Sequence, residues 1–229
     1  MFYMDEYYLM LVLPALILSL IAQVAVKSAF SKYSKVGSRG GFTGASAASE
    51  ILRKNGVYDV RVERVSGRLS DHYDPRKKVL RLSDEVYGSN SVASIGVAAH
   101  EAGHALQHAS SYGPLLLRGT LVPVANIGSN VGPYLAIAGL FMGYDPLVNI
   151  GIILFSAAVL FYVVTLPVEF NASRRALAQI GQNNMLSQAE LTGASKVLRA
   201  AAMTYLASAL VAFANLARLI LLSRGRRRR

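Results

Sequence analysis

The pentapeptide His100-Glu101-Ala102-Gly103-His104 has the residue types and the spacing needed for metal-assisted hydrolysis. Two histidines four positions apart lie on the same face of a helix and can bind one zinc ion. A glutamate between them can accept a proton from a water molecule bound to that ion. This HExxH motif therefore predicts a zinc hydrolase in which Glu101 is the general base.

A catalytic zinc ion needs a third protein ligand, and Glu169 is the best candidate. It is the only acidic residue between Asp145 and Glu190, and it directly follows a long apolar run. A carboxylate at the end of a membrane helix is costly unless it is paired or bound to a metal. The alternative interpretation is an ion pair between Glu169 and Arg174 or Arg175.

The other two histidines of the chain have different positions relative to the motif. His108 continues the helical series of His100 and His104, but it lies about 12 Å along the helix from His100. That distance excludes a shared ion, so we expect His108 to support the ligands, to end the helix or to contact the substrate. His72 lies on a predicted hairpin, either as a surface turn residue or as a fourth group near the metal.

Capping residues predict three helices in the polar region around the motif. Thr43 is a favourable N-cap for a helix that runs through Leu52 and ends at Gly56. Ser83 can cap a short helix, and Ser91 can cap the long helix that carries HExxH.

Alternating residues and turn composition predict strands beside these helices. Residues 58–65 alternate in the manner of a half-buried strand. A type I turn at residues 74–77 is predicted to join strands 68–73 and 78–82 as a hairpin. A last helix is expected to begin after Ser187.

Long uncharged runs distinguish this chain from an ordinary soluble domain. Its 229 residues are 53% hydrophobic, and the mean hydropathy is +0.36. The apolar runs cover residues 7–26, 119–144, 146–168 and 200–217, of which the last is the shortest. Buried helices of a soluble core are the weaker alternative for runs of this length. We therefore expect a mainly α-helical, multi-pass integral membrane protein with lipid as its surroundings.

The charge pattern predicts how the chain is oriented in the membrane. Asp5 and Glu6 precede the first run and basic residues follow it between positions 27 and 39, which favours an anchor over a signal peptide. This bias places the N-terminus outside and the polar region in the cytoplasm. The net charge of +11 lies beside apolar runs, so anionic lipid explains it better than nucleic acid.

The fourth run has an undecided topology on sequence alone. If it crosses the membrane, the basic tail from Arg224 lies outside, against the positive-inside rule, and Arg218 interrupts the apolar stretch. It can instead lie against the membrane surface, or tertiary contacts can overrule the charge rule.

We divide the chain into four parts on these grounds. Residues 1–26 form an N-terminal transmembrane anchor, and residues 27–118 form a cytoplasmic region of helices and strands that carries HExxH. Residues 119–168 form a transmembrane hairpin. Residues 169–229 form the helix with Glu169 and a membrane-associated helix with a basic tail.

Several separated motifs resemble the YugP-like membrane zinc metallopeptidases of bacteria. They are residues 70–78, 100–108, 121–126, 166–170 and the pair 174–175, and together they extend over nearly the whole chain. The resemblance implies a bacterial cell-membrane protein with a zinc cofactor. More remotely, the layout is similar to the gluzincin clan of HtpX and the CAAX prenyl proteases.

The resemblance also implies roles for individual residues. It makes His100, His104 and Glu169 the zinc ligands and Glu101 the base. The chain departs from the remoter clan at Ser173, which occupies the place of an aspartate that supports a ligand histidine. We expect Asn171, Asp71 or Asp74 to support the ligand histidine in place of that missing aspartate.

The expected activity is zinc-dependent cleavage of peptide bonds at the cytoplasmic membrane face, with peptides or membrane-protein segments as substrates. Tyr73 and His72 are candidates, by residue type, for a donor to the developing oxyanion. The predicted strands offer an edge where an extended substrate can pair. The alternative is a membrane scaffold or chaperone with a structural zinc site, and an ion conduit is less favoured because the first three runs carry no charge.

Overall fold

The computed structural model describes residues 4–226 and shows two compact units, each built from separate stretches of the chain. The helical unit comprises Met1–Ala22, Leu116–Pro167 and Thr204–Arg229, whereas the sheet-containing unit comprises Gln23–Leu115 and Val168–Met203. The mainly helical architecture with a small sheet is as the sequence predicts.

The sheet-containing unit has one three-stranded sheet. Its strands β1 (Arg61–Val65), β2 (His72–Asp74) and β3 (Val79–Ser83) lie in the order β1-β3-β2. β1 pairs with β3 in parallel and β2 pairs with β3 antiparallel, which confirms the predicted hairpin. The Asp74 carboxylate accepts hydrogen bonds from the backbone N–H groups two and three positions later, at 3.0 and 3.1 Å, and thereby stabilises the turn.

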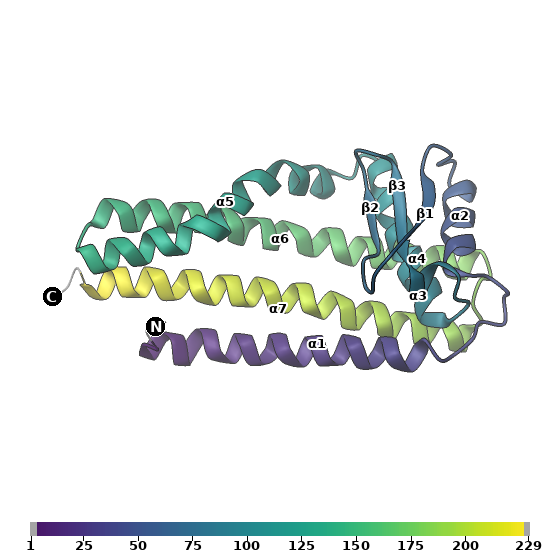
Figure 1. Cartoon of the computed structure of the whole chain (residues 1–229), viewed down its shortest axis with the longest axis horizontal. Coiled ribbons are helices and arrows are strands. Elements are labelled where there is room, and N and C mark those ends of the chain that lie inside the picture. The colour runs from purple at the N-terminus through teal and green to yellow at the C-terminus, as the bar shows by residue number, and fades with distance from the viewer. Residues whose placement is uncertain (1–3, 227–229) are drawn as a thin grey trace. The chain divides into compact units, whose positions relative to one another are not determined.

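Three helices of this unit begin at the predicted caps: α2 (Gly44–Lys54), α3 (Asp84–Tyr87) and α4 (Val92–Ala109). The Thr43 and Ser91 side chains each accept a hydrogen bond from the backbone N–H three positions later, as N-cap residues do. α4 carries HExxH and is central in the unit, packed against α2 and against the sheet (Figure 1). The core between them contains fully buried Ile51, Leu80 and Ile95.

A fourth helix, α6 (Asp145–Gln182), continues through Pro167 and brings Glu169 into the same unit. α6 approaches α4 closely at Gly103, where an added Cβ would lie 2.6 Å from the Ala172 carbonyl oxygen. Only glycine permits this spacing of the two backbones. Small residues on α4 therefore determine how near the two halves of the predicted metal site come.

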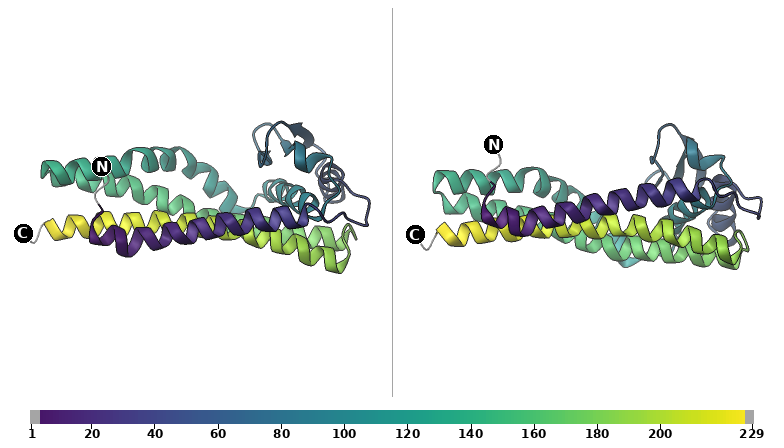
Figure 2. Two further views of the ribbon diagram at one scale, coloured as in Figure 1. Left: turned by 60° about the horizontal axis from the view of Figure 1, so that its bottom comes forward. Right: turned by 90° about the horizontal axis from the view of Figure 1, so that it is seen from below.

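In the helical unit, α5 (Gly113–Met142) and the first part of α6 run antiparallel as a helical hairpin (Figure 2). Gly128 and Gly132 of α5 lie against the α6 backbone, at the carbonyl of Leu154 and the N–H of Phe155. Such small residues four positions apart allow close packing of apolar helices without a hydrophobic driving force in lipid.

The helical unit also contains the start of α1 (Leu13–Tyr33) and the end of α7 (Gln188–Arg226). A π-helical turn (Tyr8–Val12) precedes α1. The guanidinium of Arg218 donates two hydrogen bonds to the Asp5 carboxylate, at 2.6 and 2.9 Å, and lies over the Tyr8 ring. Arg218 is 7% exposed. Arg218, which directly follows the fourth apolar run, is therefore neutralised by an acid near the N-terminus.

Three helices in the described part of the chain are long and apolar enough to cross a membrane: Tyr8–Tyr33, α6 and α7. They contain the third and fourth predicted runs and all of the first except Tyr7. Many of their large apolar side chains are exposed, including Ile17 and Leu20 of α1, which suits a lipid surface better than water. The second run lies in α5, which is not among the three, and its crossing stays a prediction.

Candidate metal centre

His100 and His104 of α4 and Glu169 of α6 converge on one point, although 65 residues or more separate the glutamate from the histidines. The Glu169 Oε2 atom lies 3.2 Å from Nε2 of His100 and 3.6 Å from Nε2 of His104. Four-residue spacing on α4 aims both imidazoles the same way, as the sequence predicts.

These three donors suit zinc in chemistry and in spacing. Ligand atoms about 2.1 Å from a tetrahedral zinc ion lie about 3.4 Å from one another. The two histidine–glutamate distances bracket that value, and all three ligand atoms lie within 4.8 Å of one another. His100, His104 and Glu169 can therefore hold one zinc ion and leave its fourth position open.

Glu169 is almost fully buried, with 2% of its surface exposed. A buried carboxylate needs a compensating charge or hydrogen bonds, and here the two histidines face it. Arg175, one of the two alternative partners, instead donates from Nε to Asn171 and lies over the Tyr112 ring. The geometry thus favours the ligand role for Glu169.

Glu101 lies on α4 between the two histidines and is half-buried. Burial alone would lower the pKa of His104, but contact with Glu169 and the nearby charges of Glu101 and Glu169 outweigh it and raise that pKa. Two carboxylates, those of Glu101 and Glu169, therefore act on the position between the histidines. A divalent ion would be attracted to it by two carboxylates.

Ser173 occupies the position where the remoter clan has an aspartate, and it fills that role itself. Its Oγ atom lies 3.1 Å from Nδ1 of His100, one turn along α6 from Glu169. A hydroxyl partner at Nδ1 orients the imidazole so that Nε2 faces the metal. Among the expected substitutes, Asp71 binds the backbone and hydroxyl of Ser83, and Asp74 stabilises the hairpin turn.

Gln107 supports the second histidine and was not among the predicted site residues. Its Oε1 atom lies 3.1 Å from Nδ1 of His104, and its Nε2 atom donates to the Val168 carbonyl and to Oδ1 of Asn171. Gln107 follows His104 by three residues, a spacing that places side chains together on a helix. That spacing is the signal that could have identified it.

Tyr73 of β2 and His108 of α4 form a pair near the end of the ligand helix. The Tyr73 hydroxyl lies 2.8 Å from Nδ1 of His108, which is one helical turn beyond His104. Burial, with the charges of Asp59 and Asp74, raises the pKa of Tyr73 to about 12. Tyr73 is therefore a protonated phenol at neutral pH and can donate a hydrogen bond.

His72 lies on the other side of β2 from this pair and is exposed. Its Nδ1 atom is 2.7 Å from the Ser70 carbonyl oxygen, and its Nε2 atom is 3.3 Å from the guanidinium of Arg81. Those partners favour the surface interpretation of His72 over a role near the metal.

A helix with HExxH whose histidines meet a buried glutamate from a second helix can hold a zinc ion by three ligands, as metallopeptidase sites do. Residues 8–224 match the family described as "Putative neutral zinc metallopeptidase", and the chain belongs to that family. This match supports zinc as the cofactor that the sequence predicts.

The chain is also similar to a curated protein of Bacillus subtilis (strain 168) described as "Putative membrane protease YugP". The two are 51% identical over 215 residues, which cover 94% of this chain and 96% of the relative. The predicted resemblance is thereby confirmed. No solved structure matches the chain.

Proposed function

We propose that the protein is a membrane-embedded zinc endopeptidase that cleaves extended segments of other proteins at the cytoplasmic membrane face. The observation that carries this proposal is the convergence of His100, His104 and Glu169, with Glu101 beside them. The family and the relative named a membrane protease support the same reaction class.

The chemistry follows from the residues around the metal position. His100, His104 and Glu169 would hold a zinc ion, which would supply a water ligand with a pKa of about 7 and a Lewis acid for the substrate carbonyl. Glu101 accepts the proton of the attacking water and passes it to the leaving amine. Tyr73, held by His108, donates a hydrogen bond to the developing oxyanion.

The sheet supplies a place for the substrate. β2 is an edge strand of the sheet, contacts α4 and contains Tyr73. An extended peptide that pairs with this edge is held mainly by backbone hydrogen bonds, which gives affinity with little dependence on side chains. Unfolded tails and loops of membrane proteins have the required conformation.

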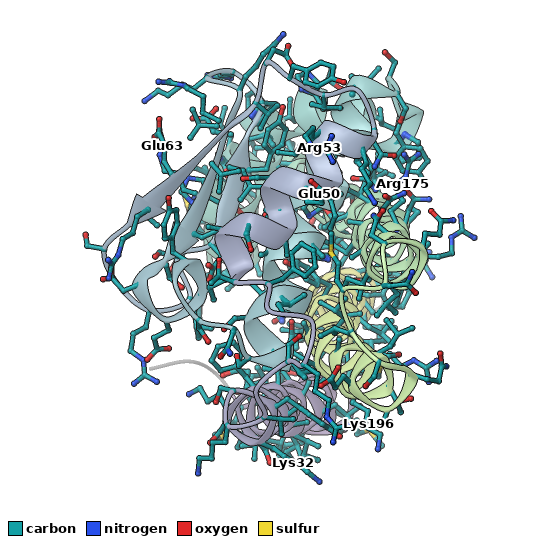
Figure 3. All side chains as sticks on the ribbon, turned by 90° about the vertical axis from the view of Figure 1, so that its right-hand side faces the viewer. Lys32, Glu50, Arg53, Glu63, Arg175 and Lys196 are labelled. Carbon is teal, nitrogen blue, oxygen red and sulfur yellow. The ribbon has the colours of Figure 1, made fainter. Side chains whose placement is uncertain are left out.

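The basic flank of the sheet-containing unit supports the cytoplasmic orientation. Lys32 of α1 and Lys196 of α7 are exposed near each other (Figure 3), and Lys27, Lys35 and Arg199 are exposed as well. Clustered lysine and arginine beside apolar helices favour the cytoplasmic leaflet and its anionic lipids.

The competing proposal is a scaffold with a structural zinc ion. Structural zinc sites are usually closed by four protein ligands. Within residues 4–226, the cluster contains three metal-binding side chains, and none of them is cysteine. A scaffold would also leave Glu101 without a role.

The decisive experiment compares the wild type with Glu101→Gln in detergent, both loaded with zinc, on an unstructured protein substrate. Glu101→Gln keeps the three ligands and removes the base. We expect equal zinc binding and a loss of at least 100-fold in kcat, as for other general bases. A zinc chelator added to the wild type should abolish its cleavage of the substrate.

Glu50→Gln is the matched control, because Glu50 lies on α2 and forms ion pairs with Arg53 and Lys54 of the same helix (Figure 3). It should cleave as the wild type does. Equal cleavage by wild type and Glu101→Gln would contradict the proposal. Zinc binding without cleavage of any unfolded substrate would favour the scaffold.

A further inference from the structure

A chain of side-chain hydrogen bonds leads from Arg175 through Asn171 and Gln107 to the metal ligand His104. Arg175 Nε lies 2.9 Å from Asn171 Oδ1, and Gln107 Nε2 lies 3.0 Å from the same oxygen. Gln107 Oε1 then reaches His104 Nδ1. Gln107 is completely buried, so its partners determine its orientation.

Two groups fix which atoms donate and which accept along this chain of hydrogen bonds, because one can only accept and the other can only donate. The Val168 carbonyl can only accept a hydrogen bond, and it lies 2.8 Å from Gln107 Nε2. The guanidinium of Arg175 can only donate, so it must face the Asn171 oxygen and not the amide nitrogen. Both constraints place the Gln107 amide nitrogen towards α6 and its oxygen towards His104.

The tautomer of His104 follows from this direction. The Gln107 oxygen can only accept, so Nδ1 of a neutral His104 must carry the proton. Its Nε2 atom then has a free lone pair, and this atom faces Glu169 at 3.6 Å. A metal ligand needs that lone pair and that orientation.

We propose that Gln107 is a positioning residue that holds His104 in the metal-binding tautomer, with its own orientation fixed by Val168 and by the Arg175–Asn171 pair. This inference rests on the proposed metal centre but not on the peptidase activity. It differs from the expectation that Asn171, Asp71 or Asp74 supports the ligand directly, because Asn171 acts here through Gln107.

The direction of the bonds gives the two amides opposite sensitivity to replacement by a carboxylate. Among the described residues, Asn171 uses its side-chain oxygen alone, which accepts from both neighbours, so an aspartate there keeps both contacts. Glutamate at position 107 would instead place an oxygen against the Val168 carbonyl and the Asn171 oxygen. Two acceptors that face each other in a buried site are destabilising.

The test measures zinc affinity by competition with a colour-forming chelator on the full-length protein in detergent. We expect Gln107→Glu and Gln107→Met to weaken zinc binding 10- to 100-fold, as loss of a ligand's supporting partner does. Asn171→Asp should stay within about threefold of the wild type, whereas Asn171→Leu should weaken binding measurably. The visible spectrum of the Co²⁺-loaded protein should change for Gln107→Met and not for Asn171→Asp.

Gln179→Met is the matched control, because Gln179 lies on α6 and bonds with Asn55 away from the ligands. Its zinc affinity should equal that of the wild type. The Asn171 variants replace a half-buried residue, so they test the network even if Gln107 variants fold poorly.

Wild-type zinc affinity in Gln107→Met, or equal effects of the two carboxylate substitutions, would overturn the inference. The two proposals fail separately. If the affinities follow the expected pattern but the wild type cleaves nothing, the peptidase is wrong and the positioning role stands. If cleavage depends on Glu101 but substitution of Gln107 leaves the zinc affinity unchanged, the peptidase stands and the positioning role is wrong.

Discussion

Tyr73 tests the catalytic assignment at the scale of a single hydroxyl group. Tyr73→Phe removes the proposed oxyanion donor and leaves His100, His104 and Glu169 in place. We expect kcat to fall about 100-fold, because one such donor contributes about that much, while zinc affinity stays unchanged. Since the pKa of Tyr73 is about 12, the wild type should keep this donor at every pH up to about 11.

His72→Ala is the control for that prediction, because His72 lies on the same strand but contacts Ser70 and Arg81. Its kcat should be close to that of the wild type. If Tyr73→Phe cleaves normally and His72→Ala does not, the assignment of the donor is wrong.

At this scale, the sequence predicts the residues that bear chemistry better than those that hold them. The four-residue spacing in HExxH places both histidines on one face of a helix. Glu169 is the single acid between Asp145 and Glu190, in a long apolar and basic stretch. Ser173 and Gln107 are ordinary polar residues on sequence alone. The contact of Ser173 with His100 becomes evident only when α4 and α6 lie side by side, whereas Gln107 lies three residues after His104 on α4 itself.

The contact between α4 and α6 can be tested by two glycines of the same helix. Gly103→Ala would place a methyl group 2.6 Å from the Ala172 carbonyl oxygen and force the helices apart. We expect destabilisation by about 1–3 kcal/mol and weaker zinc binding, because Glu169 moves away from both histidines. Thermal unfolding with and without zinc measures both effects.

Gly96→Ala provides the comparison within α4. Its added Cβ would lie 3.4 Å from the Cβ of Ala194, an ordinary contact. Stability should therefore change little or rise, since alanine favours a helix more than glycine does. Normal zinc affinity in Gly103→Ala would show that the backbone approach does not position the ligands.

Local patterns predict the elements well because they rest on local physics. Thr43 and Ser91 begin helices where their hydroxyls bond the next turn, and Asp74 forms the hairpin turn in the same way. Parallel pairing of β1 with β3 and the assignment of α6 to both units depend instead on distant packing. No local pattern contains that information.

For the whole molecule, the pair of Asp5 with Arg218 bears on the undecided topology. Both residues belong to the helical unit, so the beginning of the first helix and the end of the last lie together. If the N-terminus is outside, as the flanking charges predict, the end of α7 is outside as well. The ion pair then explains how α7 tolerates an arginine that the charge rule disfavours.

Single cysteines can test this orientation, since the chain has none of its own. We expect a membrane-impermeant maleimide to label Met4→Cys and Arg224→Cys on intact cells, because both positions are exposed. Lys35→Cys should react only after the membrane is permeabilised. Labelling of Arg224→Cys only after permeabilisation would mean that α7 does not cross.

The separation of the metal ligands along the chain has a consequence for biosynthesis. His100, Glu101 and His104 leave the ribosome before α5, whereas Glu169 follows only after the hairpin of α5 and α6. A nascent or truncated chain that ends before Glu169 has two ligands and cannot complete the site. The three proposed ligands can therefore come together only after the hairpin of α5 and α6 has been made.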